Sequence, residues 1–382
     1  MTLTASARER VTVRSLELYY VRPRWQFLRV TTDVGVDGWS EAVVEGNVRA
    51  VRGAVESLAD YLVGQDPRDV GYHWTRMYTD NFYKNGPVLT SAISAIDIAL
   101  WDIKGKLLGV PVYELLGGPV RSHVPVYCHV GGDTVDELVA STRAAMDAGF
   151  SMVKTSITAP APRLPTRRYV DGEVERFYGL RDAVGPSCEF GIDFHGRATP
   201  ALSLTLCREL EGAHPIFVEE PCLPENIDAM KDIKASTTIP IATGERLFTR
   251  WGFRGAIEAR IADVYQPDVC HAGGISELVK IAAMADAHYA QIAPHNPLGP
   301  IALAASLQVD CTCDNLLAQE LIRDLGAGLI DNPFELKDGT IAAPTGPGLG
   351  ISVNLEEVKA RQHDGSWKSP SLSYSDGSVA NW

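Results

Sequence analysis

Six acidic and imidazole side chains recur at a nearly constant interval along the second half of the chain. Counted from the first of them, the successive steps are 26, 26, 23, 27 and 25 residues. The six are Asp193, Glu219, Glu245, Asp268, His295 and Glu320. A step of this size fits one strand and one helix, so each residue would take the same place in successive strand–helix units. Gathered in one site, such groups could bind a metal ion or transfer protons.

Three of these residues, Asp193, Glu219 and Glu245, are carboxylates expected on adjacent strands. Each pair of charges at about 4 Å would repel by ~4 kcal/mol at an effective dielectric constant near 20. The set therefore requires a cation, and ligation by carboxylate oxygens alone favours a hard ion such as Mg²⁺ over zinc. A single glutamate here could equally end its strand in a salt bridge, so the prediction depends on the group of three.

Asp268 and His295 form a second group on neighbouring predicted strands. A carboxylate bonded to one imidazole nitrogen fixes the tautomer and raises the basicity of the other nitrogen, which makes His295 a candidate general base. The stretch GIDFHGR, residues 191–197, places His195 two residues after Asp193. Alternate residues of a strand share a face, so both side chains would enter one cavity. His195 is then a candidate acid, and a base and an acid together suit an elimination reaction.

Each assignment has a plainer alternative. A D-x-H sequence at a strand end can be a solvated aspartate beside a hydrogen-bonded histidine. Glu320 could stabilise an intermediate by hydrogen bonding or serve a structural purpose only. His271 precedes a glycine pair that opens a helix, which is more typical of a structural histidine. The remaining histidines share no register with other polar residues and receive no role: His73, His123, His129, His214, His288 and His363.

The elements expected to position these side chains are eight short apolar segments. They span residues 124–130, 150–157, 188–195, 215–221, 239–246, 262–268, 290–295 and 315–320. Helical segments lie between them, which predicts parallel strands joined by crossover helices. Eight such strands in succession favour a closed barrel over an open sheet, with the polar strand ends gathered at one mouth. Lys154 belongs to the same series, near the end of the second segment.

The chain before and after these units follows other patterns. Residues 11–21 and 25–44 are predicted strands around a turn at 33–38, with Asp37–Gly38 as a hairpin signal. Helical periodicity follows at 49–63 and 91–109, and a hairpin is expected after residue 330. We therefore predict three parts. They are an N-terminal α+β domain at 1–122, a barrel at 123–335 and a C-terminal segment at 336–382.

Composition narrows the class of protein. The 382 residues carry a net charge of −13, which disfavours nucleic acid and anionic membranes as partners. The seven cysteines contain no C-x-x-C pair and fit a reducing cytoplasm: Cys128, Cys188, Cys207, Cys222, Cys270, Cys311 and Cys313. No apolar run reaches 18 residues, and the first ten residues lack the apolar core of a signal peptide. We expect a cytoplasmic protein that acts on a small molecule and forms a homo-oligomer, from dimer to octamer.

The sequence resembles the enolase superfamily, mandelate racemase subgroup, over nearly the whole chain. The most specific motifs are DFHGR at 193–197 and APHNPLGP at 293–300, whereas VEEP at 218–221 alone would indicate only the superfamily. Further matching segments are PRW at 23–25, GQDP at 64–67, AIDIALWDIKGK at 95–106, GER at 244–246, QPDVCHAGGI at 266–275 and DGSVANW at 376–382.

The resemblance implies an α/β fold in which an N-terminal capping domain covers a (β/α)₇β barrel and the C-terminal segment returns to the cap. It implies three magnesium ligands: Asp193, Glu219 and Glu245. It also implies that His295 removes the proton next to the substrate carboxylate and that Asp268 raises its basicity. By the same resemblance His195 protonates the departing 3-hydroxyl, and Glu320 is the stabilising acid of the last strand.

The expected activity is Mg²⁺-dependent dehydration of an aldonate, in the first place D-galactonate, to a 2-keto-3-deoxy acid. Racemases of the subgroup carry K-x-K on the second barrel strand, but here Lys154 is followed by Ser156 at the second position. A base on only one face of the substrate favours dehydration over racemisation, epimerisation or cycloisomerisation. The alternatives are dehydration of another aldonate such as gluconate, or sugar-acid binding without catalysis.

One loop departs from the family pattern. Residues 159–172, after the second strand, are rich in proline and arginine. Loops at this mouth and in the cap set which sugar fits, so the loop bears on the choice of aldonate. Its larger side chains could contact the substrate or form a solvated lid: Arg163, Arg167, Arg168 and Tyr169.

Overall fold

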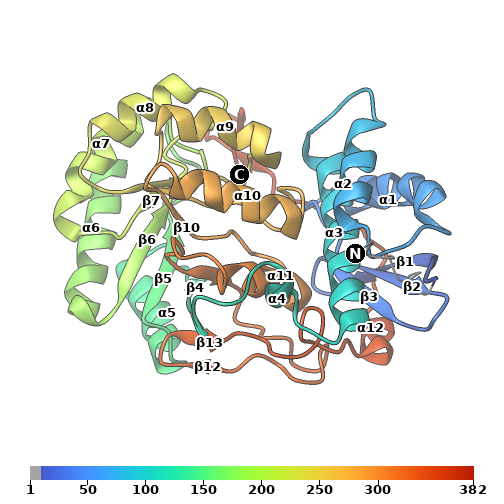
Figure 1. The fold of residues 1–382 in the computed structure, drawn as a ribbon. Helices are drawn as coiled ribbons and strands as arrows, with labels where there is room; N and C mark the ends of the chain where they lie inside the picture. Colours follow the sequence, from blue (N-terminus) through green and yellow to red (C-terminus); the bar gives the residue numbers. More distant parts are fainter. Residues whose placement is uncertain (1–9) are drawn as a thin grey trace.

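The computed structural model describes residues 10–382 (Figure 1). The N-terminal part consists of an antiparallel sheet, in the order β1-β2-β3, that packs against helices. Its strands are β1 (Val13–Val21), β2 (Trp25–Thr32) and β3 (Asp37–Glu41). The helices are α1 (Val48–Leu62), α2 (Val70–Thr79) and α3 (Pro87–Leu108), followed by the short α4 (Val112–Leu115). This α+β unit is the cap that the sequence resemblance implied.

The turn between β2 and β3 is shorter than the sequence predicted. It occupies residues 33–36 and is closed by Thr32, whose Oγ1 donates to Val36 O at 2.7 Å. Asp37 and Gly38 therefore belong to β3 and not to the turn. Gly38 is required for another reason, because a Cβ atom there would lie 2.1 Å from the backbone oxygen of Ala99 in α3.

Helix α3 joins the cap to the second half of the molecule. It is buried along most of its length, as its apolar face predicted, and it ends at Gly109, which adopts the left-handed conformation favoured at helix ends. Asp97 accepts hydrogen bonds from Ser276 N at 3.0 Å and Ser276 Oγ at 2.6 Å, in the first turn of α10. Trp101 Nε1 donates to the same hydroxyl at 2.9 Å. The cap is thus fixed by polar contacts as well as apolar packing.

The second half contains a run of parallel strands. They are β4 (His123–His129), β5 (Met152–Ser156), β6 (Glu189–Asp193), β7 (Val218–Glu219), β8 (Ile241–Thr243), β9 (Val264–Tyr265), β10 (Gln291–Ile292) and β11 (Gln319–Leu321). Neighbours in this series pair in parallel from β4 to β10, and β11 pairs in parallel with β4. Ile292 N donates to Asn315 O, and Leu317 N donates to Ile292 O, which links β10 to the segment that enters β11. Hydrogen bonding therefore runs around the whole ring, as expected of a barrel.

Seven helices connect these strands within residues 10–382, which gives the (β/α)₇β order. They are α5 (Val135–Asp147), α6 (Arg167–Val184), α7 (Pro200–Leu210), α8 (Ile227–Ala235), α9 (Thr249–Ala259), α10 (Ile275–Asp286) and α11 (Pro300–Asp310). Short 3₁₀ turns, η1 (Gly185–Ser187) and η2 (Glu211–Ala213), follow α6 and α7. Side chains fill the barrel interior, among them Tyr127 and Phe217. Gly191 of β6 makes room for Phe217, whose ring would lie 2.4 Å from a Cβ atom at position 191.

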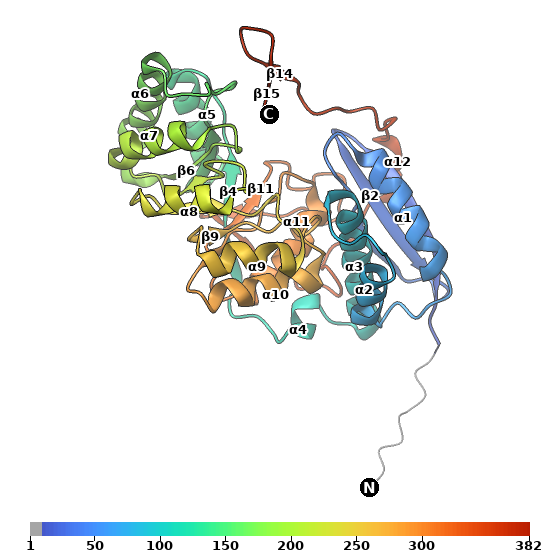
Figure 2. The same cartoon turned by 90° about the horizontal axis from the view of Figure 1, so that it is seen from above.

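The C-terminal part returns to the cap. The expected hairpin is β12 (Leu336–Lys337) and β13 (Thr340–Ala342), and β13 pairs antiparallel with the start of β4, at the end of the barrel away from the polar strand ends. Helix α12 (Leu355–Ala360) packs on β1, and His363 N donates to Tyr20 O at 3.1 Å. The chain then crosses to β14 (Leu372–Ser373) and β15 (Val379–Ala380) beside the barrel (Figure 2). The proposed boundaries at 122/123 and 335/336 stay predictions.

Three expectations can be compared directly with the structure. The loop predicted at 159–172 is shorter, because helix α6 begins at Arg167 and includes Arg168 and Tyr169. All seven cysteines are buried and unpaired, in agreement with the absence of a disulfide pattern. Among the helices of residues 10–382, none is both long and apolar enough to cross a membrane.

Candidate active site

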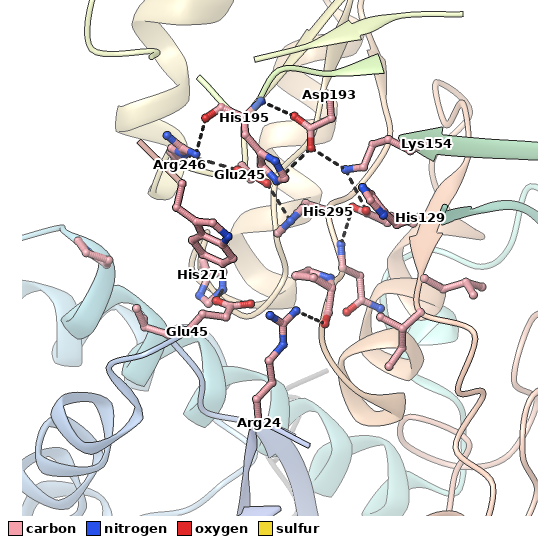
Figure 3. Close-up of a pocket in the computed structure, with 18 of the residues that line it drawn as sticks. Arg24, Glu45, His129, Lys154, Asp193, His195, Glu245, Arg246, His271 and His295 are labelled. Carbon is pink, nitrogen blue, oxygen red and sulfur yellow. Dashed lines mark hydrogen bonds and ion pairs between the residues drawn. The ribbon is translucent and has the colours of Figure 1, made fainter. Parts of the chain in front are cut away.

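The strand ends bring the polar residues of the regular interval to one end of the barrel. Figure 3 shows three of them together, Asp193, Glu245 and His295. Asp193 and Glu219 are the last residues of β6 and β7 and are direct partners in the strand register. Ser156, the last residue of β5, is in turn the register partner of Asp193. Glu320 lies within β11, whereas Glu245, Asp268 and His295 follow two or three residues after their strands: β8, β9 and β10. The predicted constellation is thus assembled by barrel geometry.

A cavity of about 610 Å³ opens at this end, between barrel and cap. Its walls include most of the predicted site residues: Asp193, His195, Glu245, His295 and Glu320. Glu219 and Asp268 do not line the cavity but are buried directly behind it. Arg24, Val44 and Glu45 reach the cavity from the cap, and Phe248 adds an apolar surface. A mixed polar and apolar cavity of this size is suited to a small molecule.

Asp193 and His195 meet as predicted, but by a different backbone route. Strand β6 ends at Asp193, and His195 lies beyond it with a left-handed backbone, φ 51°. The backbone N–H of His195 donates to Asp193 Oδ1 at 2.7 Å, and its ring Nε2 lies 3.1 Å from Asp193 Oδ2. A tight turn, and not the alternation of a strand, therefore brings the imidazole to the carboxylate.

Lys154 forms the centre of a buried charge cluster. Its Nζ lies 2.9 Å from Glu219 Oε1, 2.9 Å from Glu320 Oε1 and 3.8 Å from Asp193 Oδ2. Burial alone would lower the pKa of Lys154, but the carboxylates, Glu219 and Glu320 foremost, hold it well above its usual value. Lys154 therefore stays charged, and Gln266 Nε2 supplies a further donor to Glu219 Oε2 at 2.6 Å.

His295 lies between two carboxylates. Its Nδ1 is 2.9 Å from Asp268 Oδ2, and its Nε2 is 2.8 Å from Glu245 Oε2. Burial would lower the pKa of His295, but Glu245 and Asp268 together hold it well above its usual value. The backbone N–H of Cys270 donates to Asp268 Oδ1 at 2.7 Å, which fixes the carboxylate that orients the ring. The pairing of Asp268 with His295 is the contact that the sequence predicted.

The carboxylates that are predicted to bind metal fit a cation by their electrostatics. Burial, and then the charge of Asp193, raises the pKa of Glu219 to about 8. Asp193 Oδ2 is buried and accepts no hydrogen bond, although Lys154 Nζ and His195 Nε2 lie within 4 Å of it. Within residues 10–382, no three His, Cys, Asp or Glu side chains already stand as a metal cage. The side chains of Lys154 and His295 occupy the oxygens of Glu219 and Glu245. The donor set thus suits a hard ion, but binding requires these side chains to move.

Sequence reasoning missed several residues of the cavity. His129, to which no role was given, ends β4, and its Nε2 lies 3.1 Å from Ser156 Oγ. Burial, and then the charge of Lys154, lowers the pKa of His129 to about 4. His271 also lines the cavity, with Nδ1 2.9 Å from Ser91 Oγ, so it is held by the cap as a structural histidine would be. The step from His129 to Lys154 is 25 residues, so the regular interval could have identified His129.

The arginine-rich loop does not reach this cavity. Arg167 pairs with Asp171 on the exposed face of α6, and Tyr169 donates its hydroxyl to Thr158 O at 2.6 Å. Arg163 contacts the C-terminal segment instead, with its guanidinium 4.9 Å from the ring centre of Tyr374. In this structure, none of the four residues named for the loop lines the cavity of the site.

Fold and site together define a family. Residues 21–117 match the mandelate racemase/muconate lactonizing enzyme N-terminal domain, and residues 137–358 match the enolase C-terminal domain-like family. The chain therefore belongs to the mandelate racemase/muconate lactonizing enzyme family of the enolase superfamily, as the motifs predicted. Membership of this superfamily implies a divalent metal ion.

Individual relatives are similar over their full length. The chain is 46% identical over 380 residues to a protein from Ralstonia pickettii and to one from Verminephrobacter eiseniae, both named D-galactonate dehydratase. Each match covers 97% of this chain and 100% of the relative.

Solved structures share the fold. A mandelate racemase/muconate lactonizing enzyme from Jannaschia sp. CCS1 is 30% identical with a TM-score of 0.87, over 92% of this chain and 98% of that one. A member of the enolase superfamily from Salmonella Typhimurium is 28% identical with a TM-score of 0.86, over 92% and 98% respectively.

Proposed function

We propose that the protein is a Mg²⁺-dependent hydro-lyase that converts an aldonate, D-galactonate in the first place, to a 2-keto-3-deoxy acid. Two supports are independent of each other. The named relatives at 46% identity are D-galactonate dehydratases. The cavity is also lined by two imidazoles, and we assign His295 to proton removal and His195 to departure of a hydroxyl. From the cysteine pattern of the sequence, we infer that the protein acts in the cytoplasm.

The observation that carries the proposal is the environment of His295. Its Nδ1 is tied to the buried carboxylate of Asp268, so the ring is oriented, and Nε2 lies 2.8 Å from Glu245 Oε2 in the cavity wall. In the proposed reaction Nε2 accepts the proton next to the substrate carboxylate. Asp268 stabilises the imidazolium that results, since a carboxylate on one nitrogen raises the basicity of the other. Glu320, 2.9 Å from Lys154, faces the same cavity, and its proposed role is to stabilise the intermediate by donating a hydrogen bond, which requires its protonated form.

His195, which follows a different strand, is the proposed acid of the elimination. Burial lowers the pKa of His195, an effect that Asp193 partly offsets. In the proposed reaction His195 gives a proton to the 3-hydroxyl as its bond to carbon breaks, and water leaves. One proton is taken at one carbon and one is given at the next, so the site needs two distinct imidazoles.

Asp193, Glu219 and Glu245 would hold the metal. When bound, Mg²⁺ supplies positive charge that holds the substrate carboxylate and stabilises negative charge during proton removal. This chain carries a net charge of −13, so an anionic substrate needs such a local centre. Arg24 and Arg246 are further cations in the wall of the cavity.

Racemisation and epimerisation are disfavoured by Ser156. A second base would be needed on the opposite face of the substrate, and the second position of the K-x-K motif holds this serine. Its hydroxyl is instead a neighbour of two imidazoles, at 3.1 Å from His129 Nε2 and 3.5 Å from His195 Nδ1. Sugar-acid binding without catalysis is the remaining alternative, and it gives no reason for an oriented base and acid together.

A library of aldonates, incubated with the protein and Mg²⁺ and assayed for 2-keto acid, tests the proposal. D-galactonate is expected to give the highest kcat/KM, and gluconate is the next candidate. Calorimetry of the same aldonates supplies the control. Binding of Mg²⁺ and an aldonate without any keto acid would contradict the dehydratase and favour the non-catalytic protein.

A further inference from the structure

The segment 361–382, here called the strap, joins the cap to the barrel mouth (Figure 2). On the cap side, the guanidinium of Arg24 packs over the indole of Trp367, 5.2 Å from the ring centre. Lys368 Nζ donates to Gly46 O, and Ser369 Oγ donates to Glu45 O, both at 3.4 Å. Arg24 and Glu45 themselves line the catalytic cavity. The first half of the strap is therefore anchored to the cap residues that face the site.

The second half of the strap is held by the proline- and arginine-rich loop. Arg163 stacks its guanidinium 4.9 Å from the ring centre of Tyr374 and donates to Ser378 Oγ at 3.4 Å. The loop is in turn fixed to the barrel, because Thr199 Oγ1 at the start of α7 donates to Arg163 O at 2.8 Å. β14 and β15 pair with each other as a small hairpin between these contacts. Arg163 thus fixes the strap without reaching the cavity.

Beyond this hairpin, Trp382 enters the wall of the catalytic cavity. Its indole lies parallel to the ring of His195, with ring centres 6.4 Å apart and an angle of 18° between the planes. The residue is still 40% exposed, so part of the indole is left for a ligand. The proposed acid therefore has the metal carboxylate Asp193 on one side and an aromatic surface near the other.

We propose that Trp382 is a substrate-binding residue for the distal carbons of the aldonate, and that Arg163 is the positioning residue that holds the strap for it. The inference rests on the proposed function of the same site. It also gives the loop 159–166 a task, since the loop acts on the substrate pocket through the strap.

The order of groups in the cavity supports this placement. In the proposed reaction the carboxylate and carbons 2 and 3 lie between His295 and His195, and the remaining carbons extend past His195. Trp382 is the aromatic side chain stacked on that imidazole. The C–H groups of a polyhydroxylated chain can pack on an indole face, while the indole N–H offers one donor. The configuration at carbon 4, which distinguishes galactonate from gluconate, would then be sensed near this ring.

Steady-state kinetics of Trp382→Ala on the aldonate that the wild-type protein accepts best tests the first half. We expect KM to rise by ~10- to 200-fold, the range of one lost apolar pocket contact, with kcat changed much less. Trp382→Phe should recover most of the affinity. Trp251→Ala is the matched control, because it removes another partly exposed indole that does not line this cavity. Calorimetric binding of the aldonate gives a second readout.

The second half compares two arginines of the same region. Arg163→Ala should raise KM in the same sense as Trp382→Ala but by less, because the strap keeps its cap contacts. Arg167→Ala should leave KM unchanged, since that side chain is 91% exposed and pairs only with Asp171 among the described ion pairs. The double variant Arg163→Ala/Trp382→Ala should have the KM of Trp382→Ala alone, because Arg163 acts through the indole.

The outcomes separate the two proposals. If the wild-type protein dehydrates no aldonate, the proposed function fails and this inference fails with it. If the wild type is active but Trp382→Ala keeps its KM, or loses kcat alone, the function stands and the role of Trp382 in substrate binding is wrong. Additive effects of Arg163→Ala and Trp382→Ala would contradict the positioning role of Arg163.

Discussion

Two groups of buried carboxylates in this molecule have different surroundings. Where the cap meets the barrel, Glu41 accepts hydrogen bonds at 2.9–3.0 Å from three backbone N–H groups at the start of α11, those of Gly299, Ile301 and Ala302. At the barrel mouth, Asp193 Oδ2 and both carboxylate oxygens of Glu220 accept no hydrogen bond. Carboxylates of the first kind accept hydrogen bonds from the backbone of the fold, whereas the oxygens of the second kind have only charged or imidazole neighbours: Lys154 and His195 near Asp193, and Arg246 near Glu220.

For Asp193, which lines the cavity, the missing hydrogen bond points to a functional role. A buried polar group without a partner weakens the folded state, so its persistence at a cavity wall indicates a task other than stability. Asp102 belongs to the first kind, because it accepts from Trp39 N, Leu349 N and Lys106 Nζ. Glu219, at the mouth, accepts from the side chains of Lys154 and Gln266 and not from the backbone, and burial and the charge of Asp193 raise its pKa to about 8. Substitutions at the barrel mouth should therefore impair activity, and substitutions at the cap interface should lower stability.

The largest effect is expected at the mouth. Glu219→Gln or Glu245→Gln should abolish turnover and weaken Mg²⁺ binding, because each removes an anionic oxygen ligand. The fold should be kept, as judged by circular dichroism. Activity assays and Mg²⁺ titration calorimetry measure both effects. Glu189→Gln, at the exposed opposite end of β6, is the control and should behave as wild type. Near wild-type activity of the native protein in EDTA would refute the metal assignment.

The two histidines should differ from each other by a smaller but still large amount. His295→Asn should lose dehydration and also exchange of the substrate α-proton with deuterated water, because no proton is removed. His195→Asn should lose dehydration by ~10²–10⁴-fold or more, the usual worth of general acid catalysis. It should retain α-proton exchange, provided that His295 trades its proton with solvent before returning it.

Mass spectrometry of recovered substrate and a keto-acid assay separate the two variants. Exchange in His295→Asn but not in His195→Asn would reverse the assignment of base and acid. Loss of Mg²⁺ from His195→Asn would instead show that its main task is to support Asp193, 3.1 Å from its ring.

At the cap interface the expected loss is of stability. Glu41→Leu keeps the volume but leaves the three N–H groups of α11 without an acceptor, at ~1–3 kcal/mol for each unsatisfied donor. Denaturant unfolding should show a lower midpoint, with Mg²⁺ binding kept below the transition. Glu41→Gln retains one acceptor oxygen and should be milder. Equal midpoints for wild type and Glu41→Leu would mean that the acceptor role of Glu41 is not needed for folding.

The smallest effect is a dependence of stability on pH. Burial raises the pKa of Glu41 to about 7, only partly opposed by the N–H groups of α11. The folded state therefore binds the proton more tightly than the unfolded chain, whose glutamates titrate near 4.3. This contribution to stability is complete at low pH and falls as pH rises through about 7. Between pH 5 and 8 the free energy of unfolding should decline less in Glu41→Gln than in wild type, and equal slopes would contradict the raised pKa.

The sequence was informative wherever position depends on a repeated unit. The constant step found Asp193, Glu219 and Glu245 because each βα unit returns the chain to the same rim, and it would also have found His129. It could not find Arg24, Glu45 or Trp382. Those residues reach the cavity from the cap and the strap, and their approach depends on how separate parts of the chain dock. Docking of this kind produces no regular spacing of residues in the sequence.

At the barrel mouth, the contact between Asp193 and His195 was predicted correctly, but the backbone geometry that produces it was not. Asp193 and His195 were expected together because alternate strand residues share a face, but the strand ends at Asp193. The left-handed residue His195 makes the turn, with Gly196 at φ 62° after it. Likewise the helix α6 begins six residues earlier than the loop at 159–172 implied, because the prolines stop at position 165. Local backbone geometry of this kind is decided by a few contacts that composition does not reveal.

Closure of the barrel has a consequence for how the chain folds. β4 must find β11, and their paired residues Val126 and Gln319 are about 190 positions apart. Bringing such distant segments together is entropically costly, and high contact order slows folding. Until β11 arrives, β4 and β10 each present an unpaired edge, which favours association between incomplete chains. We therefore expect refolding to be slow and concentration-sensitive, with closure of the ring as the late event.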